Sequence, residues 1–242
     1  MNDAFVGDIG DFGKYGLLRE LTNLGLTLSV NWYKTDFETT GGGFIEYLKK
    51  PDEFKKYDPD LFQALYKIVF EDGDRRIDRI EEDGIINATF FHESIDSDRD
   101  NWWGKALKAT SDTDIVFLDP DNGLETPIMR KKNQKSPKHV RLSELQEYYS
   151  LGKTVIMYHH RPQSDSEVIC KEKVLRESAL LGTDVIHILD FPRRTNRYYF
   201  IFTQKKHEER IEELCNLMHT KWKGICKYDN QRFEHEQVRK VL

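Results

Sequence analysis

Short runs of consecutive apolar residues recur along the chain, and each is rich in β-branched or aromatic side chains. Gly, Asp, Asn or Pro bound most of these runs, which is typical of strands. Because the runs are nearly continuous rather than alternating, they predict a sheet that is covered on both faces. The predicted strands are Thr27–Tyr33, Ile86–His92, Asp114–Asp119, Thr154–His160, Asp184–Leu189 and Arg197–Thr203.

Segments with apolar residues at helical spacing lie between these strands. The predicted helices are Lys14–Leu24, Leu61–Phe70, Trp102–Ala109, Ser143–Tyr149, Ser166–Leu181 and His207–Trp222. Alternation of strands and helices predicts an α/β fold, a three-layer Rossmann-like sandwich around a mostly parallel sheet. The stretch 67–82 fits either a strand or the end of a helix.

The last two predicted strands are separated by only a short connection. It contains Pro192, Thr195 and Asn196, residue types that favour turns. We therefore predict that an antiparallel hairpin ends the otherwise parallel sheet. The chain shows no internal repeat and no low-complexity linker, so residues 1–242 are expected to form a single domain.

Composition narrows the class of protein and of partner. Aromatic residues make up 12% of the 242 residues, which argues against disorder. The formal net charge is −5, so the chain as a whole does not attract nucleic acid or an anionic membrane. Binding of nucleic acid would therefore depend on a local basic patch.

Cysteine usage and hydropathy predict the compartment. Cys170, Cys215 and Cys226 stand far apart, which fits reduced thiols better than a disulfide framework. No apolar run approaches the ~18 residues that a membrane-spanning helix needs, and no signal peptide is recognisable at the N-terminus. We expect a cytoplasmic protein that does not bind membranes.

The sequence "DIVFLDPDNGLE" carries the clearest chemical pattern. In open α/β sheets, ligands bind beyond the carboxyl ends of the strands, and here such an end is followed by Asp119, Pro120, Asp121 and Asn122. Proline fixes the backbone, so Asp119 presents hydrogen-bond acceptors at a rigid position. An ordinary strand-exit turn would use the same residue types, and this alternative stays open.

The stretch "FVGDIGDFGKYGLL" is an unusual helix start. A helix cap needs one acidic residue, whereas this segment has both Asp8 and Asp11 together with several glycines. Lys14 stands in the first turn, where the helix dipole favours anions instead. Backbone amides and glycines at a helix N-terminus also allow a ligand to approach closely. These features indicate one wall of a ligand pocket, with a plain capped helix as the alternative.

Together these motifs resemble the large-subunit ribosomal RNA adenine-N6 methyltransferases, a class I family. The pattern G-[D/N]-x-x-D-x-x-K-[H/Y] is occupied here, "GGFIEYL" resembles a segment past the family's first strand, and "FLDPDNGLE" stands where the family has Asp-Pro-Pro-Tyr. The chain departs from that loop at Asp121 and Asn122, which replace the proline and the base-stacking aromatic residue. It also delays the glycines of the cofactor loop to Gly41–Gly43.

The resemblance implies an S-adenosylmethionine-dependent methyltransferase that acts on an amino group of nucleic acid, with no metal. Residues of the strand-end loop would hold the target amine: Asp119, Pro120, Asp121 and Asn122. A second set would form the cofactor pocket: Gly7, Asp8, Asp11, Lys14, Tyr15, Asn31 and Glu93. Glu71 is an alternative to Glu93 as ligand of the ribose, but Glu93 follows the clearer strand.

A basic segment follows the strand-end loop. Met129–Arg141 contains six Lys or Arg and no acidic residue, and it lies beside the expected active edge. The residues expected to contact nucleic-acid phosphates are Arg130, Lys131, Lys132, Arg161, Arg193 and Arg194, with Arg197 as a further member of the patch. A solvated loop is the alternative interpretation.

His159 and His160 end another strand at the same edge. Adjacent strand residues point to opposite faces, so the two are not expected to chelate one metal ion. One of them could contact the substrate, while a buried, hydrogen-bonded histidine beside an exposed one is the alternative.

Two other functions remain open at this stage. Clustered carboxylates could hold Mg²⁺ in a nuclease or phosphoesterase. The candidate ligands are Asp8, Asp11, Asp36, Asp119, Asp121 and Glu125. A methyltransferase-like fold retained as a binding module, without catalysis, would also fit the altered cofactor loop.

Overall fold

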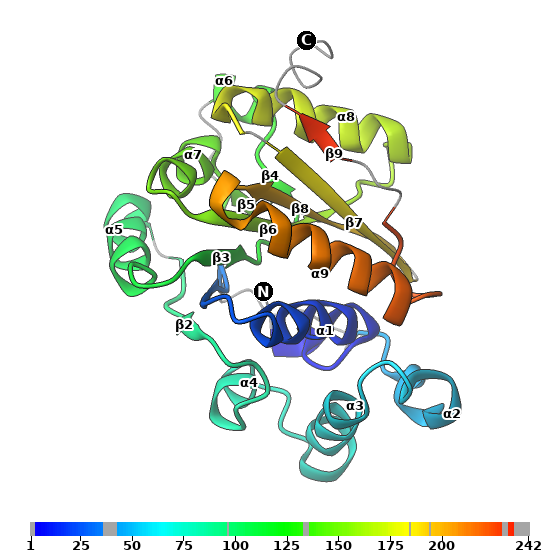
Figure 1. The fold of residues 1–242 in the computed structure, drawn as a ribbon. Helices are drawn as coiled ribbons and strands as arrows, with labels where there is room; N and C mark the ends of the chain where they lie inside the picture. Colours follow the sequence, from blue (N-terminus) through cyan, green and yellow to red (C-terminus); the bar gives the residue numbers. More distant parts are fainter. Residues whose placement is uncertain are drawn as a thin grey trace.

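A computed structural model describes residues 3–35, 43–95, 97–132, 136–183, 185–193, 195–228 and 232–234. Its centre is a seven-stranded sheet in the order β2-β1-β3-β6-β8-β7-β9 (Figure 1). The strands are β1 Leu28–Asn31, β2 Thr89–Phe91, β3 Ile115–Leu118, β6 Thr154–His160, β7 Val185–Arg193, β8 Thr195–Thr203 and β9 Arg232–Glu234. The four strands β2, β1, β3 and β6 run parallel, whereas β8 is antiparallel to both β6 and β7.

Nine α-helices connect these strands within the described ranges. They are α1 Ile9–Asn23, α2 Pro51–Phe54, α3 Pro59–Tyr66, α4 Asp78–Glu82, α5 Arg99–Ala109, α6 Pro127–Lys131, α7 Leu142–Ser150, α8 Glu167–Ser178 and α9 Glu208–Lys221. Single-turn 3₁₀ segments lie at Asp3–Phe5, Glu46–Lys49, Ala179–Leu181 and Lys205–His207. Two short strands, β4 Gly123–Leu124 and β5 His139–Val140, pair in parallel beside the main sheet.

The sheet separates two apolar cores. Ile115 and Phe117 of β3 belong to a core that includes the inward faces of α1, α3 and α9. Val116 and Leu118, which alternate with them, belong to a core with α5, α7 and α8. Because alternate strand residues point to opposite faces, one continuous apolar strand supplies both cores. The protein is thus an α/β sandwich of three layers, and the predicted fold class is confirmed.

The predicted hairpin is present, but its strands are longer than expected. β7 pairs with β8 from Val185↔Thr203 to Arg193↔Thr195, so Pro192 and Asn196 are partners within the ladder and not part of a loop. The ambiguous stretch 67–82 holds no strand: a π-helical turn, Lys67–Asp72, extends α3, and α4 follows after residues 73–77. The short elements β4, β5, β9, α2, α4 and α6 were not predicted, since none is long enough to show a periodic pattern.

The glycines of α1 serve mainly to bring the helix close to its neighbours. A Cβ on Gly13 would lie 2.6 Å from the Phe191 ring, and one on Gly16 would overlap the Trp222 indole. The helix therefore packs against β7 and the end of α9 at a distance that larger residues do not allow. The expectation that these glycines admit a ligand is wrong for Gly13 and Gly16. The missing side chain of Gly10 likewise makes room for the Arg197 guanidinium, although Gly10 also lines a cavity.

Candidate functional site

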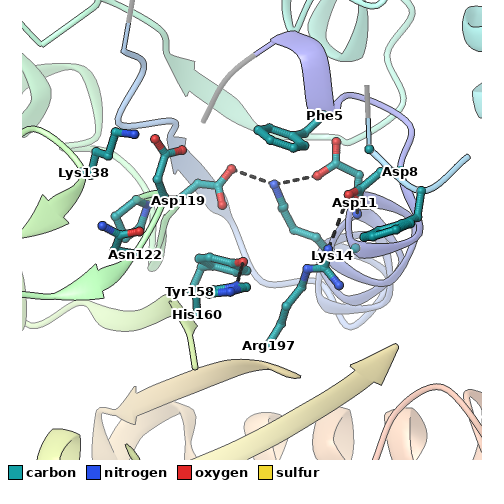
Figure 2. A pocket seen from close by; sticks show the side chains of 15 residues that line it. Phe5, Asp8, Asp11, Lys14, Asp119, Asn122, Lys138, Tyr158, His160 and Arg197 are labelled. Atoms are coloured by element: carbon teal, nitrogen blue, oxygen red, sulfur yellow. Dashed lines mark hydrogen bonds and ion pairs between the residues drawn. The ribbon is translucent and has the colours of Figure 1, made fainter. Parts of the chain in front are cut away.

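A cavity of about 360 Å³, the first cavity, opens at the carboxyl ends of β3 and β6, beside the N-terminus of α1 (Figure 2). Its position agrees with the rule that α/β sheets bind ligands at this edge. It is lined by Phe5, Asp8, Gly10, Asp11, Lys14, Gly43, Phe44, Asp119, Pro120, Asp121, Asn122, Lys138, Tyr158, His160 and Arg197. The opening motif, Gly7–Tyr15, and the strand-end loop, Asp119–Asn122, which were predicted separately, thus belong to one site.

Lys14 joins these two motifs. Its Nζ lies 2.7 Å from Oδ2 of Asp119 and 2.9 Å from Oδ1 of Asp11, and the three side chains are almost fully buried. Burial alone would lower the pKa of Lys14, but the two carboxylates outweigh it and raise that pKa. Lys14 is therefore a permanent cation between two carboxylates, which explains a lysine near the N-terminus of α1.

Asp119 directly follows β3 in a buried and rigid position. Its backbone N–H donates to the carbonyl of Asn31 at 3.0 Å, and the buried Pro120 follows it directly. Burial raises the pKa of the Asp119 carboxyl, and Lys14 acts in the opposite direction. A carboxylate in this setting is a strong, fixed hydrogen-bond acceptor at the wall of the cavity.

Asp8 and Asp11 have different roles at the start of α1. Asp8 caps α1, its Oδ1 accepting from the Asp11 N–H at 2.8 Å, while its Oδ2 lies 3.4 Å from the Arg197 guanidinium. Burial and the charge of Asp11 raise the pKa of Asp8, and Arg197 opposes this shift. Asp11 accepts hydrogen bonds from Tyr15 Oη at 2.9 Å and from the Gly7 N–H at 3.2 Å. Asp8 is therefore the helix cap, and Asp11 holds the ammonium of Lys14 in place.

Gly7 and Tyr15 support the cavity from outside it. Both donate to Asp11, and the Gly7 carbonyl accepts from Tyr47 Oη at 3.1 Å. Gly43, from the delayed glycines, does line the cavity: a Cβ there would lie 2.7 Å from Oδ2 of Asp8. Gly41 and Gly42 lie outside the described residues.

Tyr158 and His160 of β6 and Arg197 of β8 complete the lining of the cavity. Tyr158 Oη and His160 Nδ1 are 3.2 Å apart, and the antiparallel ladder places Arg197 of β8 directly across from His160. Burial raises the pKa of Tyr158 to about 12 and lowers the pKa of His160. Both groups are therefore neutral at physiological pH, beside a cationic guanidinium.

Asn31 and Glu93 do not reach the first cavity, so their prediction as parts of the same pocket is wrong. Asn31 is fully buried at the end of β1, where its Oδ1 accepts from the Tyr33 N–H at 3.2 Å. Glu93 is half exposed and pairs with Lys105 at 2.7 Å. Strand-end polar residues were expected to converge, but Asn31 ends β1 and Glu93 follows β2, whereas the cavity lies over β3 and β6.

The predicted basic residues do not form one patch. Arg130 pairs with Glu125 and Glu177, Arg161 donates to the carbonyl of Asp165, and Arg193 donates to the carbonyl of Gly224. Their guanidinium groups are therefore engaged in structural contacts. Of the other residues in this set, Lys131 and Lys132 are exposed at the end of α6, and Arg194 lies outside the described residues.

A metal centre finds little support in this geometry. In the described part of the chain, no group of three or more His, Cys, Asp or Glu side chains is arranged to hold a metal ion. The ammonium of Lys14 already lies between Asp11 and Asp119, and Glu125 accepts from the Leu142 N–H at 2.9 Å. Asp36 lies outside the described residues.

Sequence reasoning left out several residues of the first cavity. Phe5, Phe44, Lys138 and Tyr158 were not singled out, and Arg197 was placed only with the phosphate contacts. Tyr158 precedes a strand end that was already of interest, so that signal could have included it. Arg197 required the pairing of β6 with β8, which no local pattern provides.

Comparison with known proteins assigns neither a family nor an activity. No protein-family model and no curated protein matches the chain. Among solved structures, it is similar to the crystal structure of protein LPL1258 of family DUF519 from Legionella pneumophila str. Philadelphia 1. The identity is 12%, the TM-score is 0.46, and the match covers 93% of this chain and 96% of that one. Of the helices described, none has the length and apolarity needed to cross a bilayer.

Proposed function

We propose that the protein is an S-adenosylmethionine-dependent methyltransferase that acts on an amino group of nucleic acid at the first cavity. The proposal rests on one contact. Lys14 of the opening motif and Asp119 of the strand-end loop are 105 residues apart in the sequence, and their side chains lie 2.7 Å apart in one cavity. The resemblance assigns donor binding to the first motif and amine binding to the second, and transfer requires the two to be adjacent.

The side chains of the first cavity fit the charges of the proposed donor. S-adenosylmethionine carries a carboxylate, an ammonium group and a methylated sulfonium, and it supplies the methyl group. Arg197 and Lys138 would hold the carboxylate, and Asp8 would hold the ammonium. The aromatic rings of Phe5 and Phe44, both partly exposed at this cavity, would pack against the purine.

Asp119 and Pro120 would position the acceptor. An ionised Asp119 accepts a hydrogen bond from an amine N–H, and Lys14 favours that ionised form against the effect of burial. Because Asp119 directly precedes a proline and is buried, its direction is set before the substrate arrives. The contribution of the protein is then mainly orientation of the reacting nitrogen.

The net charge of −5 does not favour nucleic acid as the methyl acceptor, but the basic residues near the first cavity do. Lys131 and Lys132 are exposed at the end of α6, and Lys138 lines the cavity itself. These lysines could contact phosphates and hold a strand over the site. Such contacts give affinity that falls steeply with salt and little sequence selectivity.

The alternative of a magnesium-dependent nuclease is less well supported. The position between Asp11 and Asp119 that a divalent cation would need is taken by the Lys14 ammonium. The same arrangement suits a methyltransferase, in which a hydrogen-bond acceptor at a rigid position orients the target amine.

Binding of S-adenosylhomocysteine and transfer of a radiolabelled methyl group to RNA and DNA test the proposal. We expect the product to stabilise the protein by about 2.7 kcal/mol at 100 times its dissociation constant. Asp119→Ala should reduce methyl transfer at least ~100-fold, because the acceptor nitrogen loses its fixed hydrogen-bond partner. Glu93→Ala is the matched control, since it removes a carboxylate outside the cavity and should leave transfer unchanged.

The outcomes separate the proposed methyltransferase from a binding module. Stabilisation together with methyl transfer supports the proposal. Stabilisation without transfer to any nucleic acid would instead identify a binding module. A folded protein that shows no stabilisation at millimolar S-adenosylhomocysteine would contradict the proposal.

A further inference from the structure

A second cavity, of about 670 Å³, adjoins the first one. Its lining comes from the loop around β4, from α6, from the end of β6 and from α8, and it includes Leu124, Ile128, His139, His159, Pro162 and Val174. Asn122 and His160 line both cavities. The two spaces therefore meet at the residues that follow Asp119 and at the end of β6.

Charged groups at the second cavity are largely compensated. Glu177 and Glu125 face Arg130, and Asp165 pairs with Lys173 at 2.8 Å. Between these ion pairs the wall is apolar. A fully charged ligand would have to compete with existing partners, whereas a neutral ligand would leave the ion pairs intact.

Three histidines supply uncharged polar edges in the second cavity. Burial lowers the pKa of His139, His159 and His160, and that of His159 falls to about 3. Nδ1 of His159 accepts a hydrogen bond from the Leu124 N–H at 3.2 Å, so the proton of the neutral ring is on Nε2. The ring packs against Gly123, whose φ of +110° and missing side chain make room for it.

These histidines do not form a metal site. Over the ranges that the structure describes, no three His, Cys, Asp or Glu side chains converge in the way that a metal ion requires. The second cavity thus combines apolar walls with neutral donors and acceptors, including a fixed N–H donor on His159. This combination complements a neutral, planar heterocycle with ring nitrogens that accept hydrogen bonds.

We propose that the second cavity binds the neutral aromatic base of the acceptor, with the Asn122–His160 boundary as the point where its amino group meets the first cavity. The role as acceptor site rests on the proposed function, but the binding of a base does not. Val174 and Leu124 would contact the faces of the ring, and His159 Nε2–H would donate to its edge. The exposed Arg176 at the rim would face the phosphate of the same nucleotide.

Titration of the full-length protein with adenosine, cytidine and uridine tests this site, observed through the ¹⁵N signals of the histidine side chains. We expect at least one nucleoside to give saturable shifts of His159 and His139. Ile128→Trp narrows the mouth at a side chain that is 64% exposed, so the fold should be unaffected. We expect it to weaken nucleoside binding at least ~10-fold, or about 1.4 kcal/mol.

His159→Leu and His159→Gln form a second pair. The leucine variant removes the N–H donor and should weaken nucleoside binding about 10-fold, whereas glutamine places an N–H near the same position and should retain most of it. Thermal unfolding shows whether each variant folds. Equal affinities of wild type and Ile128→Trp, or no saturable His159 shift with any nucleoside at millimolar concentration, would overturn the inference.

Failure of the inference can be distinguished from failure of the proposed function. S-adenosylhomocysteine should bind Ile128→Trp as tightly as the wild type, because Ile128 does not line the first cavity. If the product binds but no nucleoside does, the inference is wrong and the proposed function stands. If nucleosides bind but the product does not, the second cavity is a nucleoside site in a protein with another activity.

Discussion

Two lysine–carboxylate pairs in this protein have the same N···O distance and opposite surroundings. Lys14 and Asp119 are 2.7 Å apart with about 4% of each side chain exposed. Lys105 and Glu93 are also 2.7 Å apart, but about half of each side chain is exposed. The sequence suggested a ligand-binding role for Asp119 and for Glu93 alike, since each follows a predicted strand.

The two pairs differ in their exposure to solvent and not in their N···O distance. Water screens the exposed pair, and such pairs contribute about 0–1 kcal/mol to stability. The buried pair is costly to create, and removing one partner leaves an uncompensated charge in a medium of low dielectric constant. A protein retains such a cluster where its charge has a use, which is why the Lys14–Asp119 pair marks the candidate site.

The largest expected effect comes from removing the central cation. Lys14→Met should lower the free energy of unfolding by about 3–5 kcal/mol, because Asp11 and Asp119 would remain buried without their partner. Urea denaturation at neutral pH measures this change. A loss below about 1 kcal/mol would mean that the buried pair behaves like an exposed one.

A smaller effect on stability is expected from His159, a buried group that is kept neutral, whereas Lys14 is charged and paired with carboxylates. The pKa of His159 is lowered from 6.5 to about 3, so between these values the unfolded chain binds a proton that the folded protein does not. Stability from this residue is complete above pH 6.5 and falls as the pH falls, by about 1.4 kcal/mol per unit. From pH 6.5 to about pH 5, wild type should lose about 2 kcal/mol more than His159→Gln.

Denaturation of both proteins across this pH range measures the difference. The other histidines are present in both and cancel in the comparison. Parallel stability curves for wild type and His159→Gln would show that His159 is not held in its neutral form by the fold.

The smallest effect is expected at the exposed pair. Glu93→Gln should change the free energy of unfolding by less than about 1 kcal/mol, because water already solvates both partners. The same urea experiment detects it, and 1 M salt should abolish what remains, since the screening length is then only about 3 Å. A loss as large as that of Lys14→Met would remove the distinction between the two pairs.

Most of the main sheet could be predicted because its signal is local. Each strand from β1 to β8 of the main sheet lies within or overlaps a predicted apolar run. The longer helices α1, α3, α5, α7, α8 and α9 were found from their spacing. The parallel pair β4 and β5 was missed because two residues per strand carry no pattern. β9 was missed for a similar reason, since it has three residues and follows no apolar run.

The candidate site was predicted in part. Asp8, Asp11 and Lys14 lie within seven residues at the start of one helix, and Asp119–Asn122 follow one strand, so each group was visible in a short stretch of sequence. Asn31 and Glu93 were misplaced because a strand-end position does not say over which strands a cavity lies. The buried end of β1 and the ion pair with Lys105 keep these two away from it.

The sequence by itself determined the apolar strands, the helical layers and the unusual chemistry of the two motifs, because these depend on neighbours along the chain. Only the tertiary structure decided that Lys14 pairs with Asp119, that Arg197 of β8 lies opposite His160, and that Gly13 and Gly16 serve packing. Such contacts depend on strand order, register and the closeness of approach between layers. Many sequences with the same local patterns could satisfy them differently, so they are properties of the folded core and not of any single segment.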